Sequence, residues 1–154
     1  MNRVIQKDST GCGIACVAMI SGNKYIDVKK KLLSFSGFTE DGDFYTNASE
    51  LRALSSEFNV TLGKRMSKFT SWSNIPDKAI VAINYREGED GASWHWVVFC
   101  RNKNNEFFID PKKAIKTHKR TDFGRVKVKW YLPIIKKLNK TPTLRKTYNN
   151  NSVK

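Results

Sequence analysis

The chain has 154 residues, of which 40% are hydrophobic, and it carries 28 lysines and arginines against 14 aspartates and glutamates, for a formal net charge of +14 at pH 7. This length and composition fit one domain with a core of its own. No stretch approaches the ~20 apolar residues of a membrane span, and the first residues lack the apolar segment of a secretory signal, which excludes a helical membrane protein. We therefore expect a cytoplasmic protein, unless a signal-less route exports it.

The three cysteines are an odd number, which argues against a disulfide framework and favours a reducing compartment. The positive charge is compatible with nucleic acid, an anionic membrane surface or an acidic protein as partner, or with generic solubilising charge. Charge alone supplies only the non-specific electrostatic part of nucleic-acid binding. Nucleic acid therefore stays a possible partner, and nothing in the sequence indicates an oligomeric state.

A short lead-in strand over residues 1–5 and a buried helix over residues 12–20 are the first expected elements. The second run is small and apolar, and it is too long for a lone buried strand flanked by glycines. Gly11 and Gly13 on either side of Cys12 let the backbone turn sharply into the helix and let other groups approach the sulfur. Cys12 is therefore expected in the first turn of this helix.

A cysteine in the first turn of a helix is placed to be a nucleophile. Unpaired N–H groups and the positive end of the helix dipole stabilise a thiolate, which is the reactive form of cysteine. Gln6 lies six residues upstream, close enough for its side-chain amide to double back beside the sulfur and to form an oxyanion hole with the backbone N–H of Cys12. The alternative is that Cys12 and Cys16 are two small core residues on one helix face.

Two further helices are expected before the strands. Residues 25–33 place apolar side chains on one face and lysines on the other. Residues 34–45 have the composition of a loop, and their aromatic side chains either anchor that loop or line the rim of a cleft. Asn47, three residues before Glu50, resembles a helix cap and predicts a third helix that runs to about residue 58.

After residue 59 the sequence changes to short runs rich in β-branched and aromatic residues, separated by turn formers, which predicts strands. These runs are residues 60–62, 68–72, 79–84, 94–100, 107–110 and 126–134. Helices that precede a largely antiparallel sheet are an α+β pattern. The predicted domain covers residues 1–136, and the polar, basic residues 137–154 have the composition of a disordered tail.

His95 is the histidine that the sequence marks for chemistry. It lies in a run that is apolar on both faces and is therefore central in the sheet, where a polar ring needs a partner. If residues 102–105 form the turn to the next strand, facing positions add to about 207, and Asp110 lies diagonal to His95 on the same face. Pro111 ends that strand directly after the carboxylate. His118, the other histidine, lies among lysines and arginine and is expected in a surface loop.

Cysteine, histidine and aspartate are the three groups that catalysis by a thiol requires. His95 would take the proton of Cys12 and later protonate the leaving group, while Asp110 would fix the tautomer of the ring. Taken singly, His95 is also readable as a core histidine and Asp110 as a turn former. The rival set is a zinc site made of Cys12, Cys16, Cys100 and His95. It lacks the Cys-x-x-Cys spacing of structural zinc, so no metal and no other cofactor is expected.

These residues resemble the papain-like cysteine peptidases, and most closely the bacterial leader-peptidase domains that cleave after double glycines in front of peptide-exporting ABC transporters. The resemblance spans residues 4–135 and lies in three motifs. They are Gln6 followed after five residues by the run that starts at Cys12, then His95-Trp96-Val97-Val98, then Ile109-Asp110-Pro111.

The resemblance implies a papain-like fold, with N-terminal helices packed on a mainly antiparallel sheet. It implies Cys12 as nucleophile, His95 as base, Asp110 as orienter of the base and Gln6 as oxyanion donor. We expect Gly11, Gly13, Trp94 and Trp96 at the substrate-binding cleft. The rim of the cleft would include residues 34–45 and residues 86–93, although the second segment is equally readable as an ordinary hairpin connection.

The expected function is cleavage of a peptide or isopeptide bond in a peptide or protein substrate, through an acyl-enzyme. Two alternatives stay open: deamidation or acyl transfer by a toxin or effector of the same fold, and a basic nucleic-acid-binding module that does not use the thiol. No transporter is expected to follow this domain, so the double-glycine substrate does not carry over directly. The +14 charge also departs from the family pattern.

Overall fold

The structure is a computed structural model, and it describes residues 1–139. Three helices come first in the chain: α1 (Cys12–Ser21), α2 (Tyr25–Leu32) and α3 (Ala48–Glu57). α1 is buried along its whole length, because its residues are small or apolar on every face. It ends before Gly22, whose φ of 71° lies in the left-handed region that glycine adopts readily. The helix predicted over residues 12–20 is confirmed.

α2 and α3 are amphipathic, as the sequence predicts. α2 buries Tyr25, Val28 and Leu32 on one face. α3 begins with a capping box, in which the side chain of Asn47 accepts from the backbone N–H of Glu50 and the side chain of Glu50 accepts from the N–H of Asn47. A cap of this kind stabilises a helix by about 1 kcal/mol. It fixes the start of α3, next to the N-terminal end of α1.

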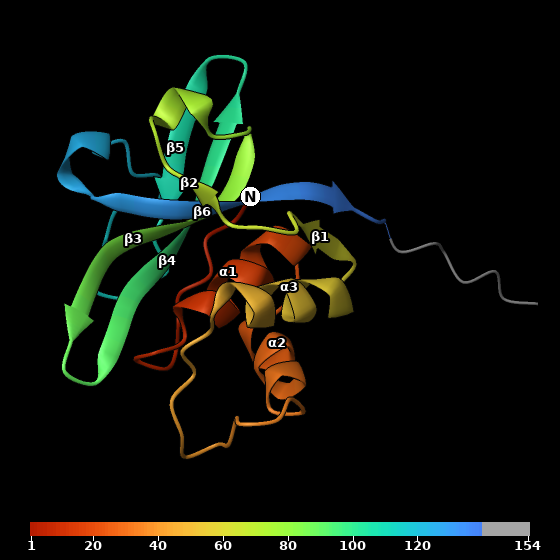
Figure 1. Ribbon diagram of the computed structural model, residues 1–154. Coiled ribbons are helices and arrows are strands. Elements are labelled where there is room, and N and C mark those ends of the chain that lie inside the picture. Colours follow the sequence, from red (N-terminus) through yellow and green to blue (C-terminus); the bar gives the residue numbers. More distant parts are fainter. Residues whose placement is uncertain (140–154) are drawn as a thin grey trace, which may run out of the picture.

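The strands form one antiparallel sheet in the order β1-β6-β3-β4-β5, and β2 pairs with Trp130 and Tyr131 of β6. Their bounds are β1 (Val60–Leu62), β2 (Ser67–Lys68), β3 (Lys78–Gly88), β4 (Gly91–Asn102), β5 (Asn105–Ile109) and β6 (Val128–Lys137), with short 3-10 helices η1 (Trp72–Asn74) and η2 (Phe123–Arg125). Figure 1 shows the three helices together on one side of the sheet, with the β3–β4 hairpin projecting beside them. This is the predicted α+β fold.

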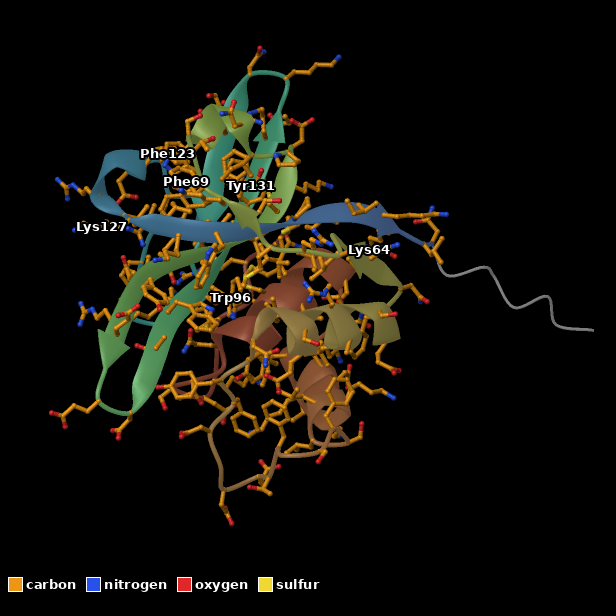
Figure 2. All side chains as sticks on the ribbon, in the orientation of Figure 1. Lys64, Phe69, Trp96, Phe123, Lys127 and Tyr131 are labelled. Atoms are coloured by element: carbon orange, nitrogen blue, oxygen red, sulfur yellow. The ribbon has the colours of Figure 1, made fainter. Side chains whose placement is uncertain are left out.

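The sheet buries apolar side chains on both of its faces. Trp96 belongs to the core cluster on the helix side, and its neighbour Val97 belongs to a second cluster on the far side. Figure 2 shows the same division, since Trp96 lies next to the helices while Phe69, Phe123 and Tyr131 lie across the sheet from them. Successive side chains of a strand point to opposite faces, so β4 has to be apolar in both sets.

Residues 1–5 do not form the expected lead-in strand. The side chain of Arg3 fixes this segment instead, by donating to the backbone carbonyls of Asp110, Lys112 and Ile115 at 2.6 to 2.8 Å. Hydrogen bonds from one side chain, which we call the Arg3 clamp, thus hold this segment in place of the backbone hydrogen bonds of a strand. It ties the start of the chain to the segment that follows β5.

The prediction of a strand over residues 68–72 is also wrong, except at residue 68. The chain leaves the sheet after β2, and Trp72 opens η1. There its ring stacks on that of Phe108 at a centroid distance of 5.7 Å and lies 4.7 Å from that of Phe123. The aromatic residues that suggested a strand therefore cover the far face of the sheet.

Residues 86–93 form an ordinary hairpin connection, which is one of the two interpretations given above. Residues 86–88 pair with residues 91–93 around a two-residue turn. β6 runs to Lys137, one residue past the predicted end of the domain. From residue 140 on, the predicted tail lies outside the described residues. Within residues 1–139, no helix combines the length and the apolar character needed to cross a membrane.

Candidate active site

Cys12 is the first residue of the buried helix α1. Gly11 stands at the N-cap and offers no side chain to the first N–H groups, so the positive end of the helix dipole lies at the sulfur. The residue is 7% exposed. The sequence-based expectation of a cysteine in the first turn is therefore confirmed, with the sulfur at the edge of the core.

Positions 11 and 13 have no room for a side chain, because a hydroxyl group packs closely against the backbone at each of them. A Cβ at Gly11 would collide with the hydroxyl of Tyr25, and a Cβ at Gly13 would collide with that of Thr46. Both glycines are buried, and neither belongs to the wall of the cavity that opens at Cys12. Their effect on that cavity is indirect, because they let Tyr25 and Thr46 pack against the turn that carries the sulfur.

His95 and Asp110 meet at one end of the β4–β5 pair. The register pairs Val98 with Ile109, which is the register predicted from the turn. The backbone pairing of β4 and β5 ends at these two residues. Beyond it the two strands are joined through side chains, because Nε2 of His95 lies 2.7 Å from Oδ1 of Asp110. The predicted diagonal contact is present.

The charges around His95 favour its protonated form. Burial alone lowers the pKa of His95, but its hydrogen bonds with Asp110 and with Cys12 outweigh burial and raise that pKa from 6.5 to about 9. Burial likewise acts to raise the pKa of Asp110, but the hydrogen bond and charge of His95 lead the contacts that lower it below its usual value. At neutral pH the pair is therefore an imidazolium beside a carboxylate.

Arg120 is a charged residue of the site that the sequence did not reveal. Its Nη1 donates to Oδ2 of Asp110 at 2.8 Å, and the backbone N–H of Lys112 donates to Oδ1 at 2.9 Å. The carboxylate is thus held from three sides. In the sequence Arg120 is one cation in a basic run, and no local signal distinguishes it from Lys116 or Lys119. His118 in the same run is exposed, as expected.

Gln6 lies close to the site, but its amide group is engaged elsewhere. Its backbone N–H donates to the carbonyl of Pro111 at 2.9 Å, which places Gln6 beside the residue that follows Asp110. Its side-chain Nε2 donates to the carbonyls of Asp8 and Ser9, at 3.0 Å each, and its Oε1 is buried without a hydrogen-bond partner among residues 1–139. To donate to an oxyanion, the amide has to release at least one of these two carbonyls.

A cavity of about 460 Å³ opens at Cys12. Trp94 and Trp96 form part of its wall, as expected, and Nε1 of Trp96 donates to the backbone carbonyl of Thr46 at 2.9 Å. The turn of the β3–β4 hairpin and the start of α3 supply most of the remaining wall. The lining residues are Cys12, Tyr45, Thr46, Asn47, Glu50, Gly88, Glu89, Asp90, Gly91, Ala92, Ser93, Trp94 and Trp96. Its charged members are all acidic, in a chain of net charge +14.

The other two thiols have different surroundings. Cys16 and Cys100 are buried and free, and burial raises the pKa of each. The rival zinc set is not assembled, because residues 1–139 contain no group of three or more His, Cys, Asp or Glu placed to hold a metal ion. Of the three cysteines, Cys12 alone contributes to the raised pKa of His95.

A family model described as the peptidase C39 family matches residues 1–131. The chain belongs to the peptidase C39 family. The resemblance to cysteine peptidases drawn from Gln6, Cys12, His95 and Asp110 is thereby confirmed at the level of the family, and with it the function of a cysteine peptidase. A comparison of this C39 chain with curated protein sequences gives no match.

Two solved structures similar to this C39 chain are peptidase domains of transporters. One is a double glycine motif protease from an AMS/PCAT transporter in complex with the leader peptide, with 17% identity, a TM-score of 0.54, and 86% of this chain and 89% of that chain covered. The other is the peptidase domain of Streptococcus ComA, a bi-functional ABC transporter involved in quorum sensing, with 16% identity, a TM-score of 0.54, and 86% and 96% covered. At these identities the likeness shows the papain-like fold, which confirms the expected architecture.

Proposed function

We propose that this C39 peptidase cleaves peptide bonds with Cys12 as nucleophile, His95 as acid and base, and Asp110 as the group that orients the ring. The hydrogen bond between His95 and Asp110, together with the effect of Cys12 on the pKa of His95, is the observation that carries the proposal. Since Asp110 takes Nε2 of the ring, Nδ1 is the nitrogen left for the thiol. The cavity at Cys12 provides the space for a substrate beside the sulfur.

The chemistry follows from these contacts. The proton of the Cys12 thiol is already held by His95 as the imidazolium, and the thiolate attacks the carbonyl carbon of the scissile bond. The tetrahedral intermediate collapses as the imidazolium gives its proton to the leaving amine, which leaves an acyl group on the sulfur. His95, now neutral, takes a proton from water, and the resulting hydroxide releases the acid and restores the thiol.

The negative oxygen of the tetrahedral intermediate needs donors near the start of α1. The backbone N–H of Cys12 is one, because it is among the first N–H groups of the helix. We propose Gln6 as the second, with its amide turning from the carbonyls of Asp8 and Ser9 when substrate binds. Such donors contribute about 10²- to 10³-fold to turnover in acyl-transfer enzymes.

The proposed substrate is a peptide or an extended protein segment. The indole rings of Trp94 and Trp96 give the cavity an apolar wall, and its size suits a few residues of extended chain. One of the two similar structures is described with a leader peptide, so double-glycine leader peptides are the first substrates to test. The three free cysteines favour the cytoplasm as the compartment.

The reactivity of the three thiols tests the proposal without knowledge of the substrate. Cys12 and Cys100 are equally exposed, at 7% each, so exposure alone would give them similar rates with a small alkylating reagent. If His95 activates Cys12, iodoacetamide modifies Cys12 much faster than Cys100, as measured by mass spectrometry of peptides. Equally slow modification of the two contradicts the proposal and favours a module that does not use its thiol.

Hydrolysis completes the test. Purified protein is incubated with a peptide library that includes double-glycine leaders, and the products are compared for wild type, Cys12→Ala and Cys16→Ala. Loss of cleavage with Cys12→Ala, together with cleavage retained in Cys16→Ala, supports the assignment. Cleavage that survives Cys12→Ala refutes it. Products of glutamine deamidation or acyl transfer in place of hydrolysis identify the alternative use of the same site.

A further inference from the structure

Arg120 joins two carboxylates, of which one belongs to the proposed catalytic set. Its Nη1 donates to Oδ2 of Asp110 at 2.8 Å, and its Nε and Nη2 donate to the two oxygens of Asp122 at 3.0 and 2.8 Å. The side chains of Arg120 and Asp110 are 13% and 3% exposed, so this contact is shielded from solvent. An ion pair so placed is stronger than one between exposed side chains.

The backbone fixes Arg120 independently of its side chain. Phe108 and Arg120 exchange two backbone hydrogen bonds of 2.9 Å as an isolated antiparallel bridge beside β5. The guanidinium then lies over the ring of Phe108, at 4.7 Å from its centroid. Both ends of the side chain are therefore held, and the Nη1 group meets Asp110 without freedom to move away.

The contacts of Asp110 leave its carboxylate one orientation. Oδ1 accepts from Nε2 of His95 and from the N–H of Lys112, and Oδ2 accepts from Arg120. Arg3 adds a bond to the backbone carbonyl of the same residue. Without Arg120, Oδ2 would be a buried carboxylate oxygen with no charged partner, and burial favours the protonated acid.

We infer that Arg120 is a positioning residue of this peptidase: it keeps the Asp110 carboxylate ionised and in the one orientation that reaches His95. The inference rests on the proposed roles of Cys12, His95 and Asp110. Arg120 does not line the cavity at Cys12, and among the proposed catalytic side chains it binds Asp110. The competing account is that Arg120 serves stability alone, by fastening the segment after β5 to the sheet.

The two accounts differ in their dependence on pH. The pKa of Asp110 is lowered by His95, by the N–H of Lys112 and by Arg120, against the effect of burial. Loss of Arg120 removes one of the lowering contributions, so Asp110 takes up its proton at a higher pH. The acid limb of activity then moves to higher pH. A residue that only fastens the segment leaves this limb in place.

The test compares Arg120→Gln and Arg120→Lys with Arg101→Gln. Arg101 is a matched control, because it lies over the ring of Phe99 at 5.0 Å, pairs with Glu106 and donates to backbone carbonyls, but does not touch Asp110. Melting temperature, kcat and KM for a cleaved peptide, and the rate of Cys12 alkylation are measured over a range of pH.

We expect Arg120→Gln to lower kcat by about 10- to 100-fold with little change in KM, by analogy with the loss of groups that orient metal-binding side chains. Its acid limb moves up, and Arg120→Lys restores the position of that limb better than it restores kcat. Parallel loss of melting temperature and kcat in Arg120→Gln and Arg101→Gln, with the acid limb unmoved, overturns the inference.

The alkylation profile separates this inference from the proposed function. If the wild-type protein shows no faster modification of Cys12 than of Cys100, the proposed catalytic set itself is wrong and the inference falls with it. If the wild type is selective and Arg120→Gln keeps the same rate and the same pH dependence, only the role of Arg120 is refuted.

Discussion

The substitution Asp110→Asn changes the charge beside His95 while it keeps the shape of the side chain. The carboxylate accepts from His95 at 2.7 Å, from Arg120 at 2.8 Å and from the N–H of Lys112 at 2.9 Å. An amide has one acceptor oxygen and no charge, so it cannot satisfy the three donors together. Because the hydrogen bond with Asp110 leads the contacts that raise the pKa of His95, that pKa falls from about 9 towards 6.5.

Between these two values the wild-type ring is charged and the variant ring is neutral, so the variant lacks the imidazolium that we propose as the acid for the leaving amine. We expect kcat/KM in this window to fall by roughly 10²- to 10⁴-fold, the range supplied by general acid–base catalysis. The alkaline limb of kcat/KM moves to lower pH, while the pH at which Cys12 alkylation reaches half of its full rate moves up, because less imidazolium is left to stabilise the thiolate. Both are measured from the acid limb to above pH 9.

The matched control is Asp122→Asn, because Asp122 also binds Arg120 but does not contact His95. This variant is expected to keep the alkaline limb of the wild type. An Asp110→Asn protein whose alkaline limb stays at its wild-type position refutes the reasoning, as does an Asp122→Asn protein that moves the limb equally far.

Three further outcomes follow from the structure. The pKa of His95 is raised on folding, so its contribution to stability, on the order of 3 kcal/mol, is complete below pH 6.5 and is lost as pH rises through about 9; urea unfolding of wild type and His95→Gln should converge at high pH. Gly13→Ala should lower stability by about 1 to 3 kcal/mol, because its Cβ meets the hydroxyl of Thr46, and the double variant with Thr46→Ala should recover most of the loss; no recovery would contradict the collision. Glu89→Lys with Asp90→Lys should reduce kcat/KM for a peptide with lysine beside the cleaved bond by about two- to fivefold per charge relative to an uncharged peptide, and the difference should shrink in high salt. An unchanged ratio between the two peptides would show that these carboxylates do not meet the substrate.

The contact between His95 and Asp110 was predictable because it depends on short-range rules. The turn over residues 102–105 sets the register of β4 and β5, and the register sets which side chains share a face. The cap at Asn47 was predictable for the same reason, since its hydrogen bonds span three residues. Such features are encoded within a few positions of the chain.

Arg120 and the clamp at Arg3 were not predictable in this way. Arg120 reaches Asp110 through a backbone bridge to Phe108, made by a segment without regular secondary structure. Arg3 binds carbonyls more than a hundred residues away, and no periodicity marks it. The aromatic residues around Trp72 led to the wrong prediction of a strand. Segments that pack on a sheet and segments that form one of its strands are rich in the same residue types, so composition does not distinguish them.

The sulfur and the imidazole come from different layers of the molecule, one from α1 and the other from β4. Until the helical layer docks on the sheet, Cys12 is an ordinary thiol with no base beside it. If Cys12 and His95 act as proposed, a newly made or partly unfolded chain is inactive, and activity appears only when the tertiary structure is complete. During refolding, the time at which Cys12 is first alkylated faster than Cys16 and Cys100 would mark that docking event.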